Sequence, residues 1–176
     1  MRFICSRCGE AHEGVPGFGW DYPISYVAIP ERERSERCSL TPDTCVIDGH
    51  NFFVRGCLEI PVLGGSDPFV WGVWVSLSDR SFSEFEAAFS LPARAHIGPF
   101  FGWLESHIHP YPETINLKTR VHLRNDGVRP QIELEPTEHP LALEQRHGIS
   151  TERVRELFEL MTHPPATSAN YRLERP

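Results

Sequence analysis

Residues 115–135 read INLKTRVHLRNDGVRPQIELE, and they carry the clearest local signal in the chain. Apolar and polar side chains alternate through the first half, which is the period of a β-strand with one buried face. Asp126-Gly127 then supplies the dipeptide typical of a two-residue hairpin turn. With these two residues as the loop, Val121 faces Ile132, so apolar side chains meet on the buried side of the hairpin.

The same register pairs opposite charges on the other side of the hairpin. Arg120 faces Glu133, and Lys118 faces Glu135. A loop of odd length would instead put the apolar partners on opposite faces of the sheet. Side-chain parity therefore supports the two-residue turn independently of the turn residues.

Further strands are predicted upstream of this hairpin. Residues 52–62 alternate, with Val54 and Leu58 on the side that faces the core. Residues 69–78 are apolar on both faces, which is typical of a strand in the centre of a sheet. A short strand is also expected at residues 26–29.

Four helices are expected between and after these strands in the sequence. The predicted helices cover residues 31–37, 84–90, 99–109 and 151–163. Ser81 or Ser83 can cap the second of them, and Ser150 or Thr151 can cap the last. The first alternates acids with arginines, as a short solvated helix does.

Length and composition indicate one globular domain. The chain has 176 residues, of which 40% are hydrophobic and 23% charged. We predict an α+β domain over residues 1–163, with an antiparallel sheet of about four or five strands, helices packed on it and an N-terminal zinc-knuckle-like segment. Residues 1–50 are its knuckle and loop-rich N-terminal part, and residues 164–176 are expected to be a flexible tail.

The charge of the chain bears on its partners. A formal net charge of -7 makes nucleic acid an unfavourable partner, because affinity for phosphate rests on clustered Lys and Arg. No apolar run has the length of a signal peptide or a membrane span, so a cytoplasmic protein without a membrane partner is expected. In that reducing compartment, the five cysteines are expected to be thiols or metal ligands.

Cys5-x-x-Cys8-Gly9 is the candidate metal site. A tight turn of this kind directs both sulfurs towards one ion, and the glycine tolerates the backbone geometry that follows. We predict a zinc site in which Cys38 and Cys45 complete the ligand set, with His12 as the competing fourth ligand.

Other interpretations of these thiols stay open. The chain has no second Cys-x-x-Cys pair, and Cys57, inside a predicted strand, is the least favoured ligand. The thiols can also be unligated and partly buried. A redox role is less favoured, because glycines and a proline follow the pair where a thioredoxin-like site has a helix start. Four protein ligands would make a zinc site structural, whereas three plus water would leave it open for catalysis.

A charged sheet face is the candidate binding surface. It is predicted to hold Arg55, Glu59, Trp74, Lys118, Arg120, His122, Glu133 and Glu135. The alternative is a solvated face whose cross-strand ion pairs each contribute roughly 0.2 to 1 kcal/mol. Trp74 favours the binding interpretation, since a large aromatic side chain among charges suits recognition.

Glu135, Glu138 and His139 are the candidate catalytic residues. Carboxylates near an imidazole can divide the proton donor and acceptor roles between them, or bind a hydrolytic metal. A histidine between Glu138 and Pro140 at a strand exit more often satisfies a turn than performs chemistry. No nucleotide cofactor is expected, because the chain has no P-loop or dinucleotide fingerprint.

Motifs spread over nearly the whole chain resemble one bacterial family. They include Phe3-x-Cys5-x-x-Cys8-Gly9-x-x-His12, Asp43-x-Cys45-x-Ile47, Phe53-Val54-Arg55-Gly56, Phe69-x-Trp71-Gly72-x-Trp74, Asn116-Leu117-Lys118, Arg129-Pro130-x-Ile132, His139-Pro140-Leu141 and Gln145-Arg146-x-Gly148-Ile149. The chain resembles domain-of-unknown-function family 2199, which implies one cytoplasmic domain and no particular activity.

Three functions are weighed on these observations. The leading hypothesis is a small interaction or ligand-binding module that is stabilised by a structural metal and binds a protein or a small ligand. The alternative is a metal-dependent hydrolase that uses an open Cys/His site or the cluster at Glu135, Glu138 and His139. A zinc-ribbon nucleic-acid binder is the third, and it fits the acidic charge poorly.

Overall fold

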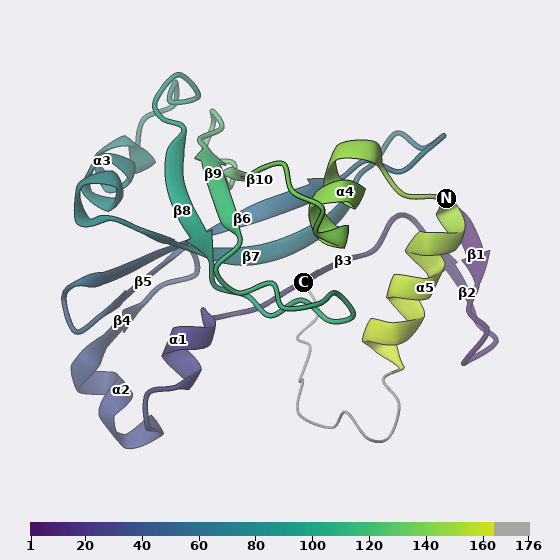
Figure 1. Ribbon diagram of the computed structural model, residues 1–176, viewed down its shortest axis with the longest axis horizontal. Helices are drawn as coiled ribbons and strands as arrows, with labels where there is room; N and C mark the ends of the chain where they lie inside the picture. Colours follow the sequence, from purple (N-terminus) through teal and green to yellow (C-terminus); the bar gives the residue numbers. More distant parts are fainter. Residues whose placement is uncertain (164–176) are drawn as a thin grey trace.

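The computed structural model describes residues 1–163, which form a mixed α/β structure around one large sheet (Figure 1). The elements are β1 (Arg2–Ile4), β2 (Ala11–Glu13), β3 (Gly17–Gly19), α1 (Ile24–Val27), α2 (Glu31–Arg37), β4 (Cys38–Leu40), β5 (Thr44–Ile47), β6 (Asn51–Ile60), β7 (Phe69–Leu77), α3 (Asp79–Phe89), β8 (Phe100–Leu104), β9 (Lys118–His122), β10 (Gln131–Leu134), α4 (Pro140–His147) and α5 (Thr151–Thr162). The expected tail at residues 164–176 lies outside the described residues.

Five strands of the large sheet close into a ring. The strand order is β3-β7-β8-β9-β10-β6-β5-β4, and β6 also pairs with β7, so that β6 to β10 form a closed circuit. The prediction of an antiparallel sheet of about four or five strands is therefore only partly right. The pairings β10–β6 and β3–β7 are parallel, and three strands extend the sheet beyond the ring. Closure is possible because twist lets the long β6 and β7 pair with different neighbours along their lengths.

The predicted hairpin is confirmed with its register. Ile132 lies opposite Val121, as expected for a loop of Asp126 and Gly127. Both loop residues have positive φ, at 57° and 71°. This is the conformation of a type I′ turn, whose twist matches that of the flanking strands.

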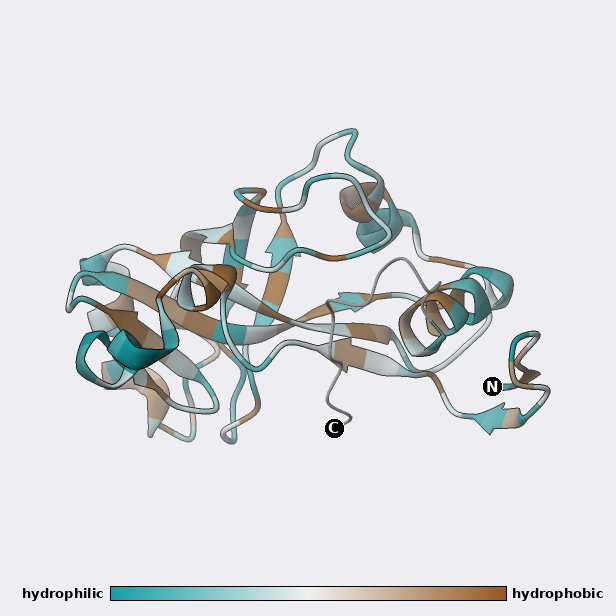
Figure 2. Ribbon diagram, turned by 90° about the horizontal axis from the view of Figure 1, so that it is seen from below, coloured by the Kyte–Doolittle hydropathy of each residue, from teal (hydrophilic) through white to brown (hydrophobic). Residues whose placement is uncertain are grey.

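The core is built from the buried side chains of the ring strands together with those of α3, α4 and α5. Figure 2 shows hydrophobic residues, in brown, concentrated on the central strands. The fully buried side chains of β6 and β7 include Val54, Leu58, Ile60, Phe69, Trp71, Val73 and Val75. The predicted helix at the C-terminal end is confirmed, because Ser150 caps α5 and Val154, Leu157 and Met161 are buried.

Residues 99–109 do not form the predicted helix. They contain β8, in which Phe100 and Leu104 are buried while Phe101 and Trp103 are exposed. A cluster of aromatic residues fits either period, and Gly102 decides for the strand. A Cβ on this glycine would collide with the Ser76 carbonyl of β7. Strands β7 and β8 can therefore approach closely because residue 102 has no side chain.

Two shorter predictions also need correction. Residues 24–27 form a helical turn instead of a strand, with the Tyr26 amide donating to the Pro23 carbonyl. Helix α3 begins at Asp79, earlier than predicted, because the Ser78 hydroxyl caps it by accepting from the Ser81 amide. Within residues 1–163 no helix is long and apolar enough to cross a membrane.

Candidate functional site

The N-terminal hairpin of β1 and β2 carries the predicted metal knuckle between its strands. It forms a two-stranded sheet that is separate from the ring. The Gly9 amide donates to the Cys5 carbonyl at 2.9 Å, and the Arg7 amide donates to the Cys5 Sγ at 3.4 Å. Gly9 has a φ of 75°, which a side chain would disfavour. The turn therefore has the backbone geometry that brings Cys5 and Cys8 to one side.

His163 joins the two thiols. One ligand atom each from Cys5, Cys8 and His163 lie within 4.8 Å of one another. His163 is the C-cap residue of α5, so this cluster links the start and the end of the described chain. The Nε2 of His12 lies 3.7 Å from the Cys8 Sγ, which keeps His12 beside the cluster.

The environment of Cys5 favours its thiolate. Burial raises the pKa of the Cys5 thiol, but hydrogen bonds from the backbone of Cys8 and Arg7 outweigh burial and lower the pKa below its ordinary value. The thiolate is the form that binds metals.

Cys38 and Cys45 are not brought to this cluster. They lie in β4 and β5, on the side of the molecule away from β1 and β2 (Figure 1). Cys45 is fully buried in a small second core, and burial, with Cys38 nearby, raises the pKa of its thiol to about 12. The four-cysteine ligand set is therefore not assembled, and Cys57 stays half-buried in β6.

No local spacing pointed to His163. It follows the apolar stripe of α5 and precedes two prolines, which is the pattern of an ordinary helix end. Its approach to Cys5 depends on how α5 packs against the hairpin.

The hairpin is held to α5 by other contacts as well. The Ser6 amide and hydroxyl donate to the carboxylate of Glu159 at 2.6 and 2.8 Å. The rings of Phe3 and His12 pack on Phe158, with centroids 5.2 and 4.4 Å away.

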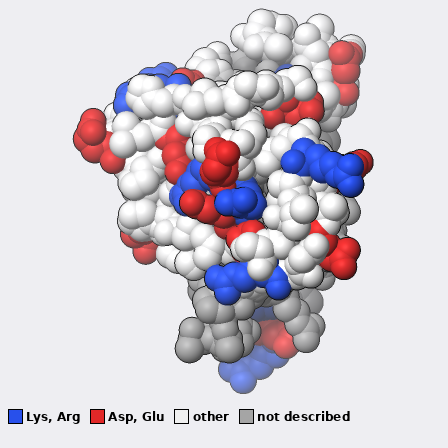
Figure 3. Space-filling view, turned by 90° about the vertical axis from the view of Figure 1, so that its right-hand side faces the viewer, with Lys and Arg blue, Asp and Glu red and all other residues white. Residues whose placement is uncertain are grey.

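Figure 3 shows the right-hand face of Figure 1, where acidic and basic side chains are interspersed and not segregated by sign.

Trp74 does not belong to an exposed charged face. Its side chain is 0% exposed, and its Nε1 donates to the Trp20 carbonyl at 2.9 Å. The N-terminal segment and β5 cover this part of β7 and build the second core around Trp74. The predicted role of Trp74 as a contact residue is corrected, because segments that are distant in sequence bury it.

β8 exposes a different aromatic pair on the sheet face. Phe101 and Trp103 are 46% and 39% exposed, and their rings form an edge-to-face pair with centroids 5.1 Å apart. The register sets Phe101 opposite Arg120 and Trp103 opposite Lys118. Side chains directly opposite on neighbouring strands share one face, so that the aromatic pair lies beside two cations. The misassignment of residues 99–109 as a helix concealed this surface.

The charged residues of β9 and β10 are partly paired among themselves. His122 Nε2 lies 2.7 Å from Glu133, and Arg120 lies 3.8 Å from Glu135. Lys118 has no ion pair within the described part of the chain, residues 1–163. It is also the only lysine of the 176 residues.

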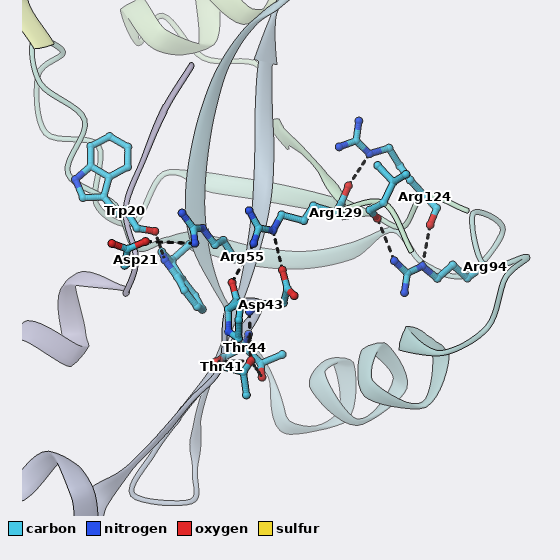
Figure 4. Close-up of polar contacts among 12 residues, drawn as sticks. Trp20, Asp21, Thr41, Asp43, Thr44, Arg55, Arg94, Arg124 and Arg129 are labelled. Atoms are coloured by element: carbon cyan, nitrogen blue, oxygen red, sulfur yellow. Dashed lines mark hydrogen bonds and ion pairs between the residues drawn. The ribbon is translucent and has the colours of Figure 1, made fainter. Parts of the chain in front are cut away.

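Arg55 takes part in a different network. Its Nη1 lies 3.6 Å from Asp21, while Arg129 donates to Asp43 at 2.7 Å. Figure 4 shows the two guanidinium groups side by side, each next to its own aspartate. Burial lowers the pKa of Arg55, and the neighbouring charge of Arg129 lowers it further. The two arginines and the two aspartates balance each other's charge, as in a structural ion-pair network.

Two open clefts adjoin these features. One of about 560 Å³ lies in the fork where β6 and β10 diverge, and its lining includes Glu59, His122, Glu133 and Arg146. The other, of about 800 Å³, lies between the N-terminal hairpin, residues 62–67 and the first turn of α5.

The candidate catalytic residues are occupied in structural contacts or lie at the surface. His139 caps α4 by accepting from the Leu141 amide through Nδ1, and Glu135 pairs with Arg120. Glu138 is exposed. Among residues 1–163 these three do not form a metal-type cluster.

Comparison with known proteins gives one match. None of the curated proteins and none of the solved structures matches the chain. The model of a family described as "Uncharacterized protein conserved in bacteria (DUF2199)" matches residues 4–149. The chain therefore belongs to the family DUF2199.

Proposed function

We propose that the protein is a small cytoplasmic interaction module that docks a partner on the outer face of β8 and β9 and is stabilised by a structural metal ion. The observation that carries the docking site is the exposed edge-to-face pair of Phe101 and Trp103 beside Lys118 and Arg120. Tryptophan and arginine are, with tyrosine, enriched among the residues that dominate binding energy at protein interfaces.

Several features favour recognition over an ordinary surface. β8 pairs with β7 on one side and with β9 on the other, so that its backbone is occupied and a partner would contact side chains. Adjacent exposed aromatic rings form a contiguous apolar surface, which monomeric proteins generally keep small. Charged neighbours at its edge supply the polar rim typical of an interface.

The chemistry of the face favours a protein segment with apolar and acidic side chains. The ammonium group of Lys118 has no carboxylate partner within residues 1–163, so that a carboxylate of the partner can pair with it while an apolar side chain packs on Trp103. Nucleic acid is less suited, because the chain carries a net charge of -7 and Arg120 already neighbours Glu135.

A direct test uses Lys118 as the reporter. Reductive methylation with ¹³C keeps the charge and labels Lys118 and the N-terminal amine alone, since the chain has no other lysine. An octapeptide of aspartates that carries one leucine and one phenylalanine is expected to shift the Lys118 methyl signal. An all-aspartate octapeptide is expected to shift it much less, because it cannot pack on the aromatic pair.

Variants separate docking from general charge attraction. Phe101→Ser combined with Trp103→Ser is expected to abolish the shift and leave the melting temperature nearly unchanged, since both side chains are exposed. Tyr22→Ser, at another exposed aromatic residue, is the matched control and should leave the shift intact. Equal shifts with both peptides, or a shift that survives the double variant, would refute the proposal, and a stronger response to an oligothymidine would favour nucleic acid.

A metal-dependent hydrolase is the second candidate. One observation supports it, namely that three ligand atoms, and not four, lie mutually close at Cys5, Cys8 and His163. A zinc ion with three protein ligands can hold a water molecule that attacks a substrate. Zinc-loaded protein that hydrolyses p-nitrophenyl acetate, with loss of this activity in His163→Ala, would favour the hydrolase.

A further inference from the structure

We infer that Cys5, Cys8 and His163 bind one zinc ion, with His12 as the fourth ligand, and that this ion fastens the N-terminal hairpin to the end of α5. The inference deepens the structural-metal part of the proposed function by naming the ligand set. It is independent of the docking face on β8 and β9, because the two sites share no residue and different measurements report on them.

The distances suit a tetrahedral ion with sulfur and nitrogen ligands. Zinc binds cysteine sulfur at about 2.3 Å and histidine nitrogen at about 2.0 Å, which sets the ligand atoms of a tetrahedral site roughly 3.3 to 3.8 Å apart. The ligand atoms of Cys5, Cys8 and His163 all lie within 4.8 Å of one another. Small rotations of the side chains are enough to reach coordination distances.

The backbone supports this assignment independently of the side chains. The Arg7 amide points at the Cys5 sulfur, and the Gly9 amide closes the turn on the Cys5 carbonyl. An N–H donor to sulfur stabilises a thiolate in its ligand orientation, as outer contacts of metal ligands generally do. Cys8 is exposed and His163 half-buried, so that an ion can enter from solvent.

His12 is placed to complete the set. Its Nε2 is 3.7 Å from the Cys8 sulfur, already a ligand-to-ligand distance for zinc. Its ring rests against Phe158 and Phe3, with centroids 4.4 and 5.5 Å away. These contacts hold the imidazole beside the three mutually close ligand atoms, and the inference requires its ring to turn towards the ion. Four protein ligands make the centre structural.

The position of the ion explains what it would do. Within residues 1–163 the hairpin shares no strand pairing with the ring, and the amide and hydroxyl of Ser6 bind it to α5 through hydrogen bonds to Glu159. A metal bond to His163 adds a strong link between the hairpin and α5. Because the hairpin also forms one wall of the 800 Å³ cleft, the same link holds that wall in place.

The rival interpretation of this geometry is a dithiol and disulfide pair at Cys5 and Cys8. A disulfide would leave His163 and His12 without a role in binding, and it would require an oxidising partner. The two interpretations therefore differ in the effect of removing a histidine.

The test measures zinc per chain in the full-length protein after loading in reducing buffer and gel filtration. Wild type is expected to hold one zinc ion. His163→Ala and Cys5→Ser are each expected to weaken zinc binding by more than about 100-fold, the upper range for loss of an outer-sphere partner. Cys38→Ser and His147→Ala are matched controls at a thiol and an imidazole outside the cluster, and both should retain the ion.

Cobalt substitution reports on the fourth ligand. Cobalt(II) bound to two thiolates and two imidazoles gives an intense tetrahedral visible spectrum, and His12→Ala is expected to shift this spectrum and weaken binding. The melting temperature of zinc-loaded wild type should fall on chelation, whereas that of His163→Ala should not change. Circular dichroism of each variant establishes that loss of metal does not reflect unfolding.

Three results would overturn the inference. Wild type that holds no zinc, with or without a disulfide between Cys5 and Cys8, removes the site. Zinc that survives in His163→Ala but is lost in Cys38→Ser restores the four-cysteine set. An unchanged cobalt spectrum in His12→Ala shows that water is the fourth ligand. None of these results affects the peptide titration on Lys118, so that the docking proposal stands or fails separately.

Discussion

Arg94 shows at the scale of one residue how the fold uses a buried charge. Its side chain is 1% exposed, and its guanidinium donates to the carbonyls of Phe89, Arg124 and Val128. These carbonyls end α3 and flank the turn of the β9–β10 hairpin. The arginine therefore joins a helix end to a hairpin tip through carbonyl oxygens.

Arg94→Met is expected to lower the free energy of unfolding by about 3 kcal/mol, because it leaves buried carbonyls without donors. Urea denaturation measures this loss. Arg80→Met is the control, since the exposed pair of Arg80 with Glu84 should contribute less than about 0.5 kcal/mol. A loss below about 1 kcal/mol for Arg94→Met would contradict the assignment.

Glu105 makes stability depend on pH. Its side chain is 9% exposed, burial raises its pKa above the ordinary 4.5, and the hydrogen bond from Ser25 at 2.7 Å offsets part of the rise. The folded state therefore binds this proton more tightly than the unfolded state. Stability falls as pH rises from 4.5 through the raised pKa.

Glu105→Gln is accordingly expected to be more stable than wild type at pH 8, with a difference that shrinks towards pH 4.5. Urea midpoints across this range measure it. Glu113 provides a control of opposite sign, because a hydrogen bond from the Ile115 amide lowers its pKa. Glu113→Gln should be less stable than wild type above pH 4.5. A Glu105→Gln variant that is less stable than wild type at pH 8 would contradict the predicted effect of Glu105.

At the scale of elements, β8 decides both the ring and the proposed docking face. It pairs with β7 through Gly102 opposite Leu77 and with β9 through Phe101 opposite Arg120. Its inward residues belong to the core, and its outward residues are the exposed aromatic pair. A change that pushes β8 away from β7 should therefore disturb closure and the outer face together.

Gly102→Ala is expected to destabilise the protein by about 2 kcal/mol, because the new methyl group would overlap β7. Gly65→Ala is the control, since a Cβ there meets Val62 only at ordinary contact distances of 3.4 Å or more. Thermal unfolding of the two variants gives the comparison. Similar melting temperatures would mean that β7 and β8 have room for a methyl group between them.

At the scale of the whole molecule, the start and the end of the described chain meet at one place. The hairpin and α5 touch through Ser6, Phe3 and His12, and the proposed zinc ion lies at this junction. The ring belongs to the large sheet, which is separate from the two-stranded sheet of the hairpin. Loss of the ion should therefore loosen the junction and leave the ring intact.

Hydrogen exchange tests this separation. Chelation is expected to speed amide exchange in residues 2–13 and in the last turns of α5, and to leave β6 and β7 protected. His163→Ala in zinc-containing buffer should behave like the chelated wild type, because it is not expected to retain the ion. Uniform protection in both states, or equal loosening of the ring, would count against a local role for the ion.

Much of this fold was predictable from local sequence. The register of Val121 with Ile132 and the turn at Asp126 and Gly127 were predicted correctly, because side-chain period and turn chemistry act over a few residues. The cap of α5 at Ser150 was one of two candidates, with Thr151 as the other. The Cys5-x-x-Cys8 turn was visible for the same reason. These features need no knowledge of what lies elsewhere in the chain.

Other features depended on contacts between distant segments. Trp74 and Trp103 both lie on sheet strands, yet one is buried by the N-terminal segment and the other is exposed, so period alone could not distinguish them. Closure of the ring and the approach of His163 to Cys5 likewise bring together residues far apart in sequence. Such meetings follow from how whole elements pack, and no local pattern encodes which distant surface a strand or helix end will face.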